Sequence, residues 1–219
     1  MPVKLNSSVG GSVTLTTPAT ASNFTATFPA NTGTVVTDSA TQTLTNKTLT
    51  SPTITGASVS AMASSVITSG TAVASTSGTS IDLTGIPSWA KRVTVIFQEV
   101  STNGISRVIV QLGATTITTS GYGAAGSTSF GGTSIANIGS SQGFIIESAT
   151  ATELRNGMMI FTNISGNTWC GMSAFGYSGG AAGFGGGFVS LSGTLDRVRI
   201  TTVNGTDTFD AGRINILYE

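Results

Sequence analysis

The chain has 219 residues, of which 8% are charged, and its nine basic and nine acidic side chains cancel. This balance excludes the long-range field that attracts proteins to nucleic acid or anionic membranes. The absence of histidine excludes Ser-His-Asp and Cys-His catalysis and histidine metal sites, and a single cysteine excludes an internal disulfide.

The N-terminal part, up to about residue 80, is rich in threonine and serine and carries few charges. Residues 14–19 and 25–30 repeat a T-x-T-x-P-A pattern, and threonines alternate with apolar residues, which favours extended backbone. The first residues hold one lysine, Lys4, and no continuous apolar segment, so we expect no secretory signal and synthesis in the cytoplasm. No apolar run approaches the roughly 20 residues of a transmembrane helix, so we expect no membrane insertion.

A five-residue rhythm occupies residues 41–55, TQTLT-NKTLT-SPTIT, and places Leu44, Leu49 and Ile54 at equal intervals. Periodic units bury their apolar sides against neighbouring copies, and three pentads are too short to do so within one chain. We therefore predict that residues 38–60 form a slender intertwined β shaft of three identical chains, with these three residues at its axis. A disordered threonine-rich linker is the alternative.

The composition changes near residues 75–80, beyond which most of the charged residues and every Trp and Tyr are found. This change divides the chain into three predicted parts, residues 1–37, 38–79 and 80–219. The third part alternates apolar and polar residues over short segments separated by Gly, Asn and Ser turns, which is typical of β structure. We predict an all-β fold whose C-terminal domain is an antiparallel, jelly-roll-like β-sandwich of about eight strands.

Several of these strands have a predicted inner face. A strand from Arg92 is followed by a turn at residues 101–104 and by residues 106–113 as its partner strand. The best helix candidate, at most two turns, is residues 148–158. The inner face of the first strand carries Val93, Val95 and Phe97. A second strand carries Val198 and Ile200 on its inner face and Arg197 and Arg199 on the opposite face. The inner face of the last strand carries Ile214, Ile216 and Tyr218.

Two segments, residues 120–133 and 176–187, are dense in glycine. Such segments are costly to order, and small residues interspersed with aromatic rings are typical of adaptable binding loops. Long loops with packed aromatic rings are the alternative. The candidate receptor-binding residues are the large side chains of these segments: Tyr122, Phe130, Tyr177 and Phe184.

We find no pattern that indicates catalysis. Cys170 follows Trp169 and is interpreted as a buried small hydrophobic residue rather than a nucleophile. The carboxylates are scattered, and no glycine-rich phosphate loop is present. Asn204, Asp207 and Asp210 do not have the spacing of a calcium loop and are interpreted as turn residues. We therefore predict no catalytic residue, no metal site and no cofactor.

Three stretches together resemble tail fibres and related structural proteins of tailed bacteriophages. They are ANTGTVVT with the following SATQTLTNKTLTSPTITG (residues 30–37 and 39–56), LTGIPSWAKRVTVIFQEVSTNG (residues 83–104), and VRITTVNGTDTFDAGRINILYE (residues 198–219). They cover about a third of the chain. The threonine pentads alone are weakly specific, whereas IPSWAKR and the closing hairpin make the resemblance more specific.

The resemblance implies a homotrimeric fibre on a virion, with residues 1–37 attached to a tail adaptor, nozzle or baseplate protein. Residues 38–79 would be the shaft and linker, and residues 80–219 the receptor-binding domain that meets a host polysaccharide or outer-membrane protein. A head fibre or decoration protein on the capsid is the alternative. A polysaccharide depolymerase is less compatible, because 219 residues leave no room for a long parallel β-helix.

Overall fold

The structure, a computed structural model, describes residues 3–6, 9–10, 12–15, 48, 50, 67–130, 134–151 and 153–219. The chain divides into two compact units, Met1–Ala57 and Ser58–Glu219. In the first unit, β1 (Val3–Asn6) and β2 (Ser12–Leu15) pair as an antiparallel hairpin. The predicted shaft residues Leu44, Leu49 and Ile54 lie outside the described residues.

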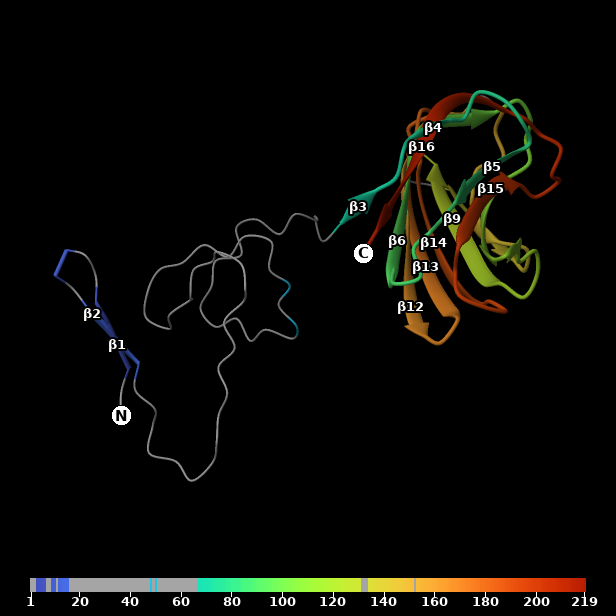
Figure 1. The fold of residues 1–219 in the computed structure, drawn as a ribbon. Coiled ribbons are helices and arrows are strands. Elements are labelled where there is room, and N and C mark those ends of the chain that lie inside the picture. The colour runs from blue at the N-terminus through green and yellow to red at the C-terminus, as the bar shows by residue number, and fades with distance from the viewer. Residues whose placement is uncertain are drawn as a thin grey trace. The chain divides into compact units, whose positions relative to one another are not determined.

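The second unit consists of two antiparallel sheets (Figure 1). The nine-stranded sheet runs in the order β10 (Ser134–Ser140), β9 (Gly123–Phe130), β14 (Ala182–Ser190), β13 (Thr168–Tyr177), β12 (Arg155–Ser165), β6 (Arg92–Thr102), β16 (Phe209–Tyr218) and β3 (Thr68–Ser69), with β4 (Val73–Ala74) also paired to β16. The five-stranded sheet runs β11 (Phe144–Ile146), β7 (Val108–Ala114), β15 (Arg197–Thr202) and β5 (Ser80–Thr84), with β8 (Thr116–Ile117) paired to β7.

Every strand pairing in the described residues is antiparallel, which confirms the predicted all-β, antiparallel class. The described ranges contain no helix, and therefore none long and apolar enough to cross a membrane.

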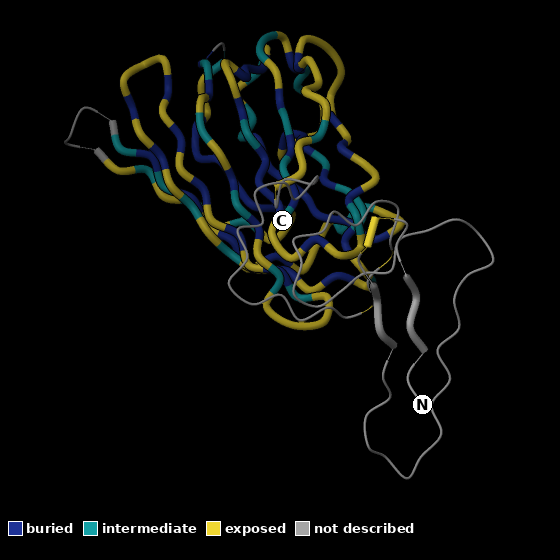
Figure 2. The backbone as a smooth tube through the Cα atoms, turned by 60° about the vertical axis from the view of Figure 1, so that its left-hand side comes forward, coloured by how far each residue is buried: buried dark blue, intermediate teal, exposed yellow. Residues whose placement is uncertain are grey.

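The two sheets enclose one hydrophobic core, whose buried residues come from the inward faces of both (Figure 2). The alternation in the sequence located this core correctly. Its members include the three inner faces predicted above, from Val93 on β6 to Tyr218 on β16. Aromatic rings join the layers: Phe144 of β11 meets Phe161 of β12 edge to face, with ring centroids 4.9 Å apart. Such aromatic pairs add stability beyond the area that they bury.

One predicted strand pairing differs in the structure. Residues 108–114 form β7, but β7 pairs with β15 and β11, whereas β6 pairs with β12 and β16. The chain therefore crosses between the sheets after the turn at residues 101–104, and all seven residues of β7 are buried. A tight turn specifies a change of direction, but it does not specify which sheet the next strand joins.

Residues 148–158, the best candidate for a short helix, form none in the described residues, because β12 begins at Arg155. The side chain of Arg155 is fully buried and donates hydrogen bonds to the carbonyl oxygens of Glu153, at 3.1 Å, and Ser148, at 3.4 Å. In a helix, those carbonyl oxygens would instead accept hydrogen bonds from main-chain N–H groups further along the chain. Burial lowers the pKa of Arg155, so this guanidinium is held in place by local main-chain acceptors at a cost in desolvation.

The compact second unit begins before the composition boundary near residue 80. Both β3 and β4 pair with the C-terminal strand β16, and Gly70 donates its N–H to Ile216 at 2.8 Å. Ser75 is fully buried and donates its hydroxyl to the carbonyl of Ala211 at 2.8 Å. Residues 68–75, which were assigned to the linker, therefore cover the edge of the nine-stranded sheet.

Candidate functional site

The two glycine-dense segments form strands, which corrects the prediction of loops. They supply β9 and β14, which pair with each other from Gly123↔Phe188 to Ser129↔Ala182. One inward glycine lets the opposite sheet approach closely: a Cβ on Gly126 would lie 2.9 Å from the carbonyl oxygen of Ile145. Packing between the sheets therefore explains Gly126, because any larger residue there would push β11 away.

The four candidate receptor-binding residues have different environments. Tyr122 and Tyr177 are buried, and their hydroxyls donate to main-chain carbonyls, at 2.9 Å to Thr118 and at 3.2 Å to Glu147. Burial raises the pKa of Tyr122 to about 12 and also raises that of Tyr177. These two tyrosines therefore serve the core rather than a contact surface. The side chain of Phe130 lies outside the described part of the chain, and Phe184 alone of the four is shown exposed.

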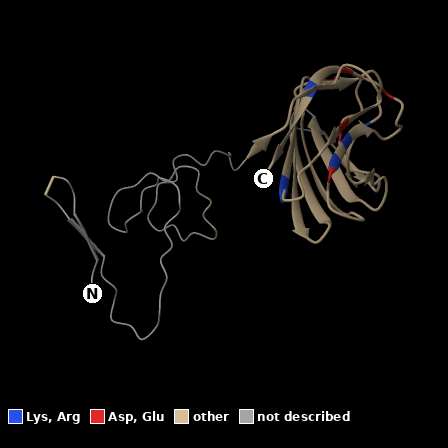
Figure 3. Ribbon diagram, in the orientation of Figure 1, with Lys and Arg blue, Asp and Glu red and all other residues tan. Residues whose placement is uncertain are grey.

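Phe184 belongs to a wider surface that we call the apolar face, defined as the outward residues of β9, β10, β12, β13 and β14. Cross-strand partners on this face run from Asn137 through Ser127, Phe184 and Ala174 to Met158. Among the described outward residues of these five strands none is charged, and in Figure 3 neither β13 nor β14 carries a charged residue. The large exposed hydrophobic residues of this face include Ile135, Met158, Met172, Phe184 and Phe188.

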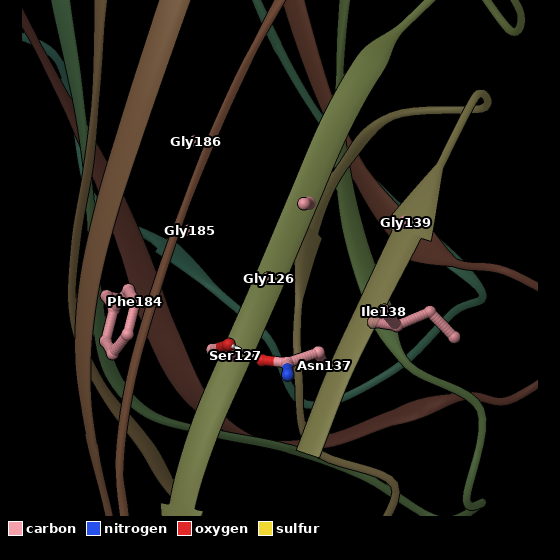
Figure 4. Close-up of a pocket in the computed structure, with 9 residues that line it drawn as sticks. Gly126, Ser127, Asn137, Ile138, Gly139, Phe184, Gly185 and Gly186 are labelled. Carbon is pink, nitrogen blue, oxygen red and sulfur yellow. Dashed lines mark hydrogen bonds between the residues drawn. The ribbon is translucent and has the colours of Figure 1, made fainter. Parts of the chain in front are cut away.

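A shallow hollow of about 490 Å³ lies on the apolar face across β14, β9 and β10. Figure 4 shows Phe184 on one side of it, with Ser127 and Asn137 towards the β9–β10 side. Ser127 and Asn137 are hydrogen-bonded to each other through their side chains. The floor is hollow because Ala125, Gly139 and Gly186 occupy outward positions with little or no side chain. The geometry suits a large apolar group from a partner rather than a charged ligand.

Cys170 lies on this face and is exposed, which corrects its interpretation as a buried residue. Successive residues of a strand point to opposite faces, so burial of Trp169 turns Cys170 outward. Cys170 stands opposite Phe188 of β14 and Thr162 of β12. The reactivity of its thiol can therefore be used to measure whether the apolar face is accessible.

The outer face of the five-stranded sheet, which we call the polar face, has the opposite character. Arg199 on β15 forms a two-pronged ion pair with Asp82 on β5, with N–O distances of 2.7 and 2.6 Å. Gln111 on β7 donates to the carbonyl of Gln142 at 2.9 Å, and Thr201 donates to that of Thr79 at 2.8 Å. These bonds hold the polar groups in fixed positions before any ligand arrives.

Two cavities of about 330 and 300 Å³ follow the polar face and its neighbouring edge, and both are lined by Gln142 and Val203. Together they form a trough bordered by hydroxyl, amide and guanidinium groups. The sequence placed Arg197 and Arg199 on an outer face but gave no sign of the trough, because Asp82 and Arg199 are 117 positions apart. The polar residues of the trough include Ser80, Ser106, Arg107, Gln111, Thr119, Ser140, Ser141, Gln142, Arg199, Thr201 and Asn204.

Several of the remaining carboxylates have structural partners. Glu147 is buried and pairs with Arg107, and Asp196 pairs with Arg197 at 2.7 Å. The Arg197 bond lowers the pKa of Asp196, and the Glu147 bond raises the pKa of Arg107. Asn204 accepts the N–H groups of Thr206 and Asp207, which agrees with the turn interpretation. The described ranges hold no group of three or more His, Cys, Asp and Glu residues with the geometry of a metal site.

Comparisons with models of protein families, with curated proteins and with solved structures found no match to this chain.

Proposed function

We propose that this chain is a structural protein of a bacteriophage virion, a trimeric tail fibre that attaches the particle to the host cell surface, and not an enzyme. The single observation that carries the proposal is the contrast between the two outer faces of the second unit, called the β unit below. One face is uncharged and apolar, and the other offers a trough of preorganised polar groups. An assembly surface and a recognition surface on one small domain are what such a fibre tip needs.

The other parts of the proposal follow from the sequence. Residues 1–37 attach to a tail adaptor, nozzle or baseplate protein, and Leu44, Leu49 and Ile54 line a three-chain shaft. Burial of each of these side chains between chains would contribute roughly 1.5–3 kcal/mol. Two antiparallel sheets around one core support a jelly-roll-like C-terminal domain. Three tips on one shaft would bind far more strongly than one through avidity.

The polar face is the proposed receptor-binding surface, and a host polysaccharide is the receptor that its chemistry fits best. Sugars present many hydroxyl groups, and the hydroxyl, amide and guanidinium groups that line the trough can form hydrogen bonds with them. The Arg199–Asp82 pair holds a guanidinium donor and two acceptor oxygens in place across β15 and the edge strand β5. An outer-membrane protein is the second receptor class. Phe184 is left out of this surface because it lies on the other sheet.

Antibody labelling of intact virions tests the location. We expect an antibody against the purified full chain to label the tail in electron micrographs. Label confined to the head would replace this proposal with its runner-up, a head fibre or decoration protein. Virions without any label would overturn both.

Binding of the purified full chain to host cells tests the receptor surface. We expect Arg199→Ala to weaken binding by about tenfold, because it removes one anchored polar group from each site. Arg92→Ala is the matched control, since Arg92 forms a comparable exposed pair with Glu219 on the nine-stranded sheet. Equal binding by Arg199→Ala and the parent chain would reject the polar face as the receptor surface.

A further inference from the structure

On five strands of the nine-stranded sheet, β9, β10, β12, β13 and β14, the outward residues do not follow the usual pattern of a sheet with one face in water. An antiparallel sheet of this kind normally alternates apolar residues inward with polar residues outward. On the five-stranded sheet, the outward residues of β5 and β15 obey this rule, from Ser80 and Asp82 to Arg199 and Thr201. On the nine-stranded sheet, Met172 is 62% exposed, Phe184 66% and Phe188 53%. A single chain would leave these three large apolar side chains in contact with water.

These side chains form one continuous surface. Gly186 lies opposite Met172, so the Met172 side chain stands between Phe184 and Phe188, its diagonal neighbours on β14. Ala174 lies opposite both Phe184 and Met158, which extends the surface to β12. Isolated exposed hydrophobic residues are ordinary, but a contiguous cluster across several strands marks an interaction surface.

The area of this surface is close to what a stable interface requires. The exposed parts of Ile135, Met158, Met172, Phe184 and Phe188 amount to about 590 Å², at roughly 200 Å² for each whole side chain. A standard protein–protein interface buries about 800 Å² on each partner. The small outward residues between the large ones, including Cys170, Ala174, Ala182 and Gly186, supply much of the remainder.

The composition of the face indicates a protein partner. Aromatic residues and methionine are enriched in the cores of protein interfaces and charged residues are depleted there. A sugar needs hydrogen-bonding partners for its hydroxyl groups, and the exposed side chains of Met158, Met172 and Ile135 offer none. A membrane-surface segment would carry lysine or arginine around its apolar side, and the described outward residues of these strands include neither.

A second copy of the same chain is the partner that fits. Symmetric assembly brings identical residues close together near the axis, so a charge on the face would meet its own copy. An uncharged face avoids that repulsion. The hollow beside Phe184, about 490 Å³, has room for a large apolar side chain from a neighbouring copy.

We propose that the apolar face of β9, β10, β12, β13 and β14 is the contact between copies of this chain, with Met172, Phe184 and Phe188 at its centre. This assigns a trimer contact within the C-terminal unit, separate from the shaft at residues 38–60. It rests on the proposed oligomer but makes its own claim about location.

Labelling of Cys170, the only cysteine in the chain, tests this location in the full-length protein. Since Cys170 is exposed at the centre of the face in a single chain, an interface there would cover it. We expect a maleimide to react about tenfold more slowly with the native oligomer than with the chain unfolded in urea. Light scattering on the same sample gives the number of copies.

Met172→Lys then serves as the disrupting variant. We expect it to lower the oligomer mass and to restore rapid labelling of Cys170, with the β-sheet circular dichroism unchanged because Met172 points outward. The matched control is Ile105→Lys, which places the same charge at a 71% exposed hydrophobic residue in the turn after β6. The control should keep both the mass and the protection.

The outcomes separate this inference from the proposed function. An oligomer whose Cys170 reacts at the unfolded rate would overturn the inference and leave the trimer, held by the shaft. A host polysaccharide whose binding is lost in Met172→Lys at unchanged mass would also overturn it, and would make the apolar face the receptor surface. A monomeric parent chain would overturn both the inference and the trimeric fibre.

Discussion

The two outer faces of the β unit follow the same strand alternation but carry different chemistry. Outward residues of β15 and β5 are joined by the Arg199–Asp82 ion pair, whereas outward residues of β13 and β14 include Met172, Phe184 and Phe188. Both faces surround one core, so the core residues do not account for the difference between them. The outward residues of a sheet therefore report what each face meets after folding, while the inward residues report only the core.

Adding a side chain to each face of one strand tests this division most severely. Gly171 and Gly176 both lie on β13, but Gly171 points inward and a Cβ there would lie 2.7 Å from Phe144 and 2.8 Å from Phe161. We expect Gly171→Val to lower the free energy of unfolding by about 3 kcal/mol through overpacking. Gly176→Val should change it by less than about 0.5 kcal/mol, because that position is open. Urea denaturation measures both, and similar losses would contradict the division into inner and outer faces.

Two ion pairs, Arg107–Glu147 and Arg199–Asp82, allow a comparison between a buried carboxylate and an exposed one. Glu147 is buried, so Arg107→Ala would leave a carboxylate without its partner, and we expect a loss of about 2 kcal/mol in the free energy of unfolding. Arg199→Ala removes an exposed partner, and the loss should stay below about 1 kcal/mol. An equal loss in both variants would show that the Arg199 pair stabilises the fold rather than presenting polar groups for recognition.

Alkaline unfolding is expected to give a smaller effect than Gly171→Val or Arg107→Ala, and it concerns the inner side of the five-stranded sheet. The hydroxyl of Tyr122 accepts the N–H of Leu112 at 2.8 Å, and the folded protein keeps the hydroxyl proton until the pKa of about 12. Unfolded chains release this proton near pH 10, so stability is full below pH 10 and falls as pH rises towards 12. We expect Tyr122→Phe to remove about 1–2 kcal/mol of that fall in denaturation curves measured from pH 9 to 11.5. An unchanged pH dependence would contradict the burial of this hydroxyl.

Local patterns were sufficient to predict the core strands. Val198 and Ile200 alternate with Arg197 and Arg199, and period-two burial requires nothing beyond the residues themselves. The β class and the antiparallel pairing followed from such segments and from the turns between them. The turn at Asn204-Gly205 was also predictable, because Asn followed by Gly favours a turn. In the structure Gly205 takes a φ of +69°.

Pairing over long distances was not predictable. Glycine-dense segments 120–133 and 176–187 have few side chains that indicate a strand, and they become ordered because β9 and β14 pair with each other against β11. The burial of Tyr122 and Tyr177 and the exposure of Cys170 depend on that same pairing, so each could be assigned only after the sheet order was known. The shaft residues Leu44, Leu49 and Ile54 remain a prediction.

The pairing of β3 and β4 with the last strand has a mechanical consequence. Under the proposed function, tension from the virion enters the tip at residue 67 and first reaches a segment held by short strands and a few bonds, among them Gly70 to Ile216 and Ser75 to Ala211. That segment can peel away while the two sheets stay closed, because the core lies beyond it. Released, residues 67–75 would lengthen the tether by up to about 30 Å. A particle pulled by flow would then lengthen its connection to the cell before the pulling force reaches the contact between the tip and its receptor.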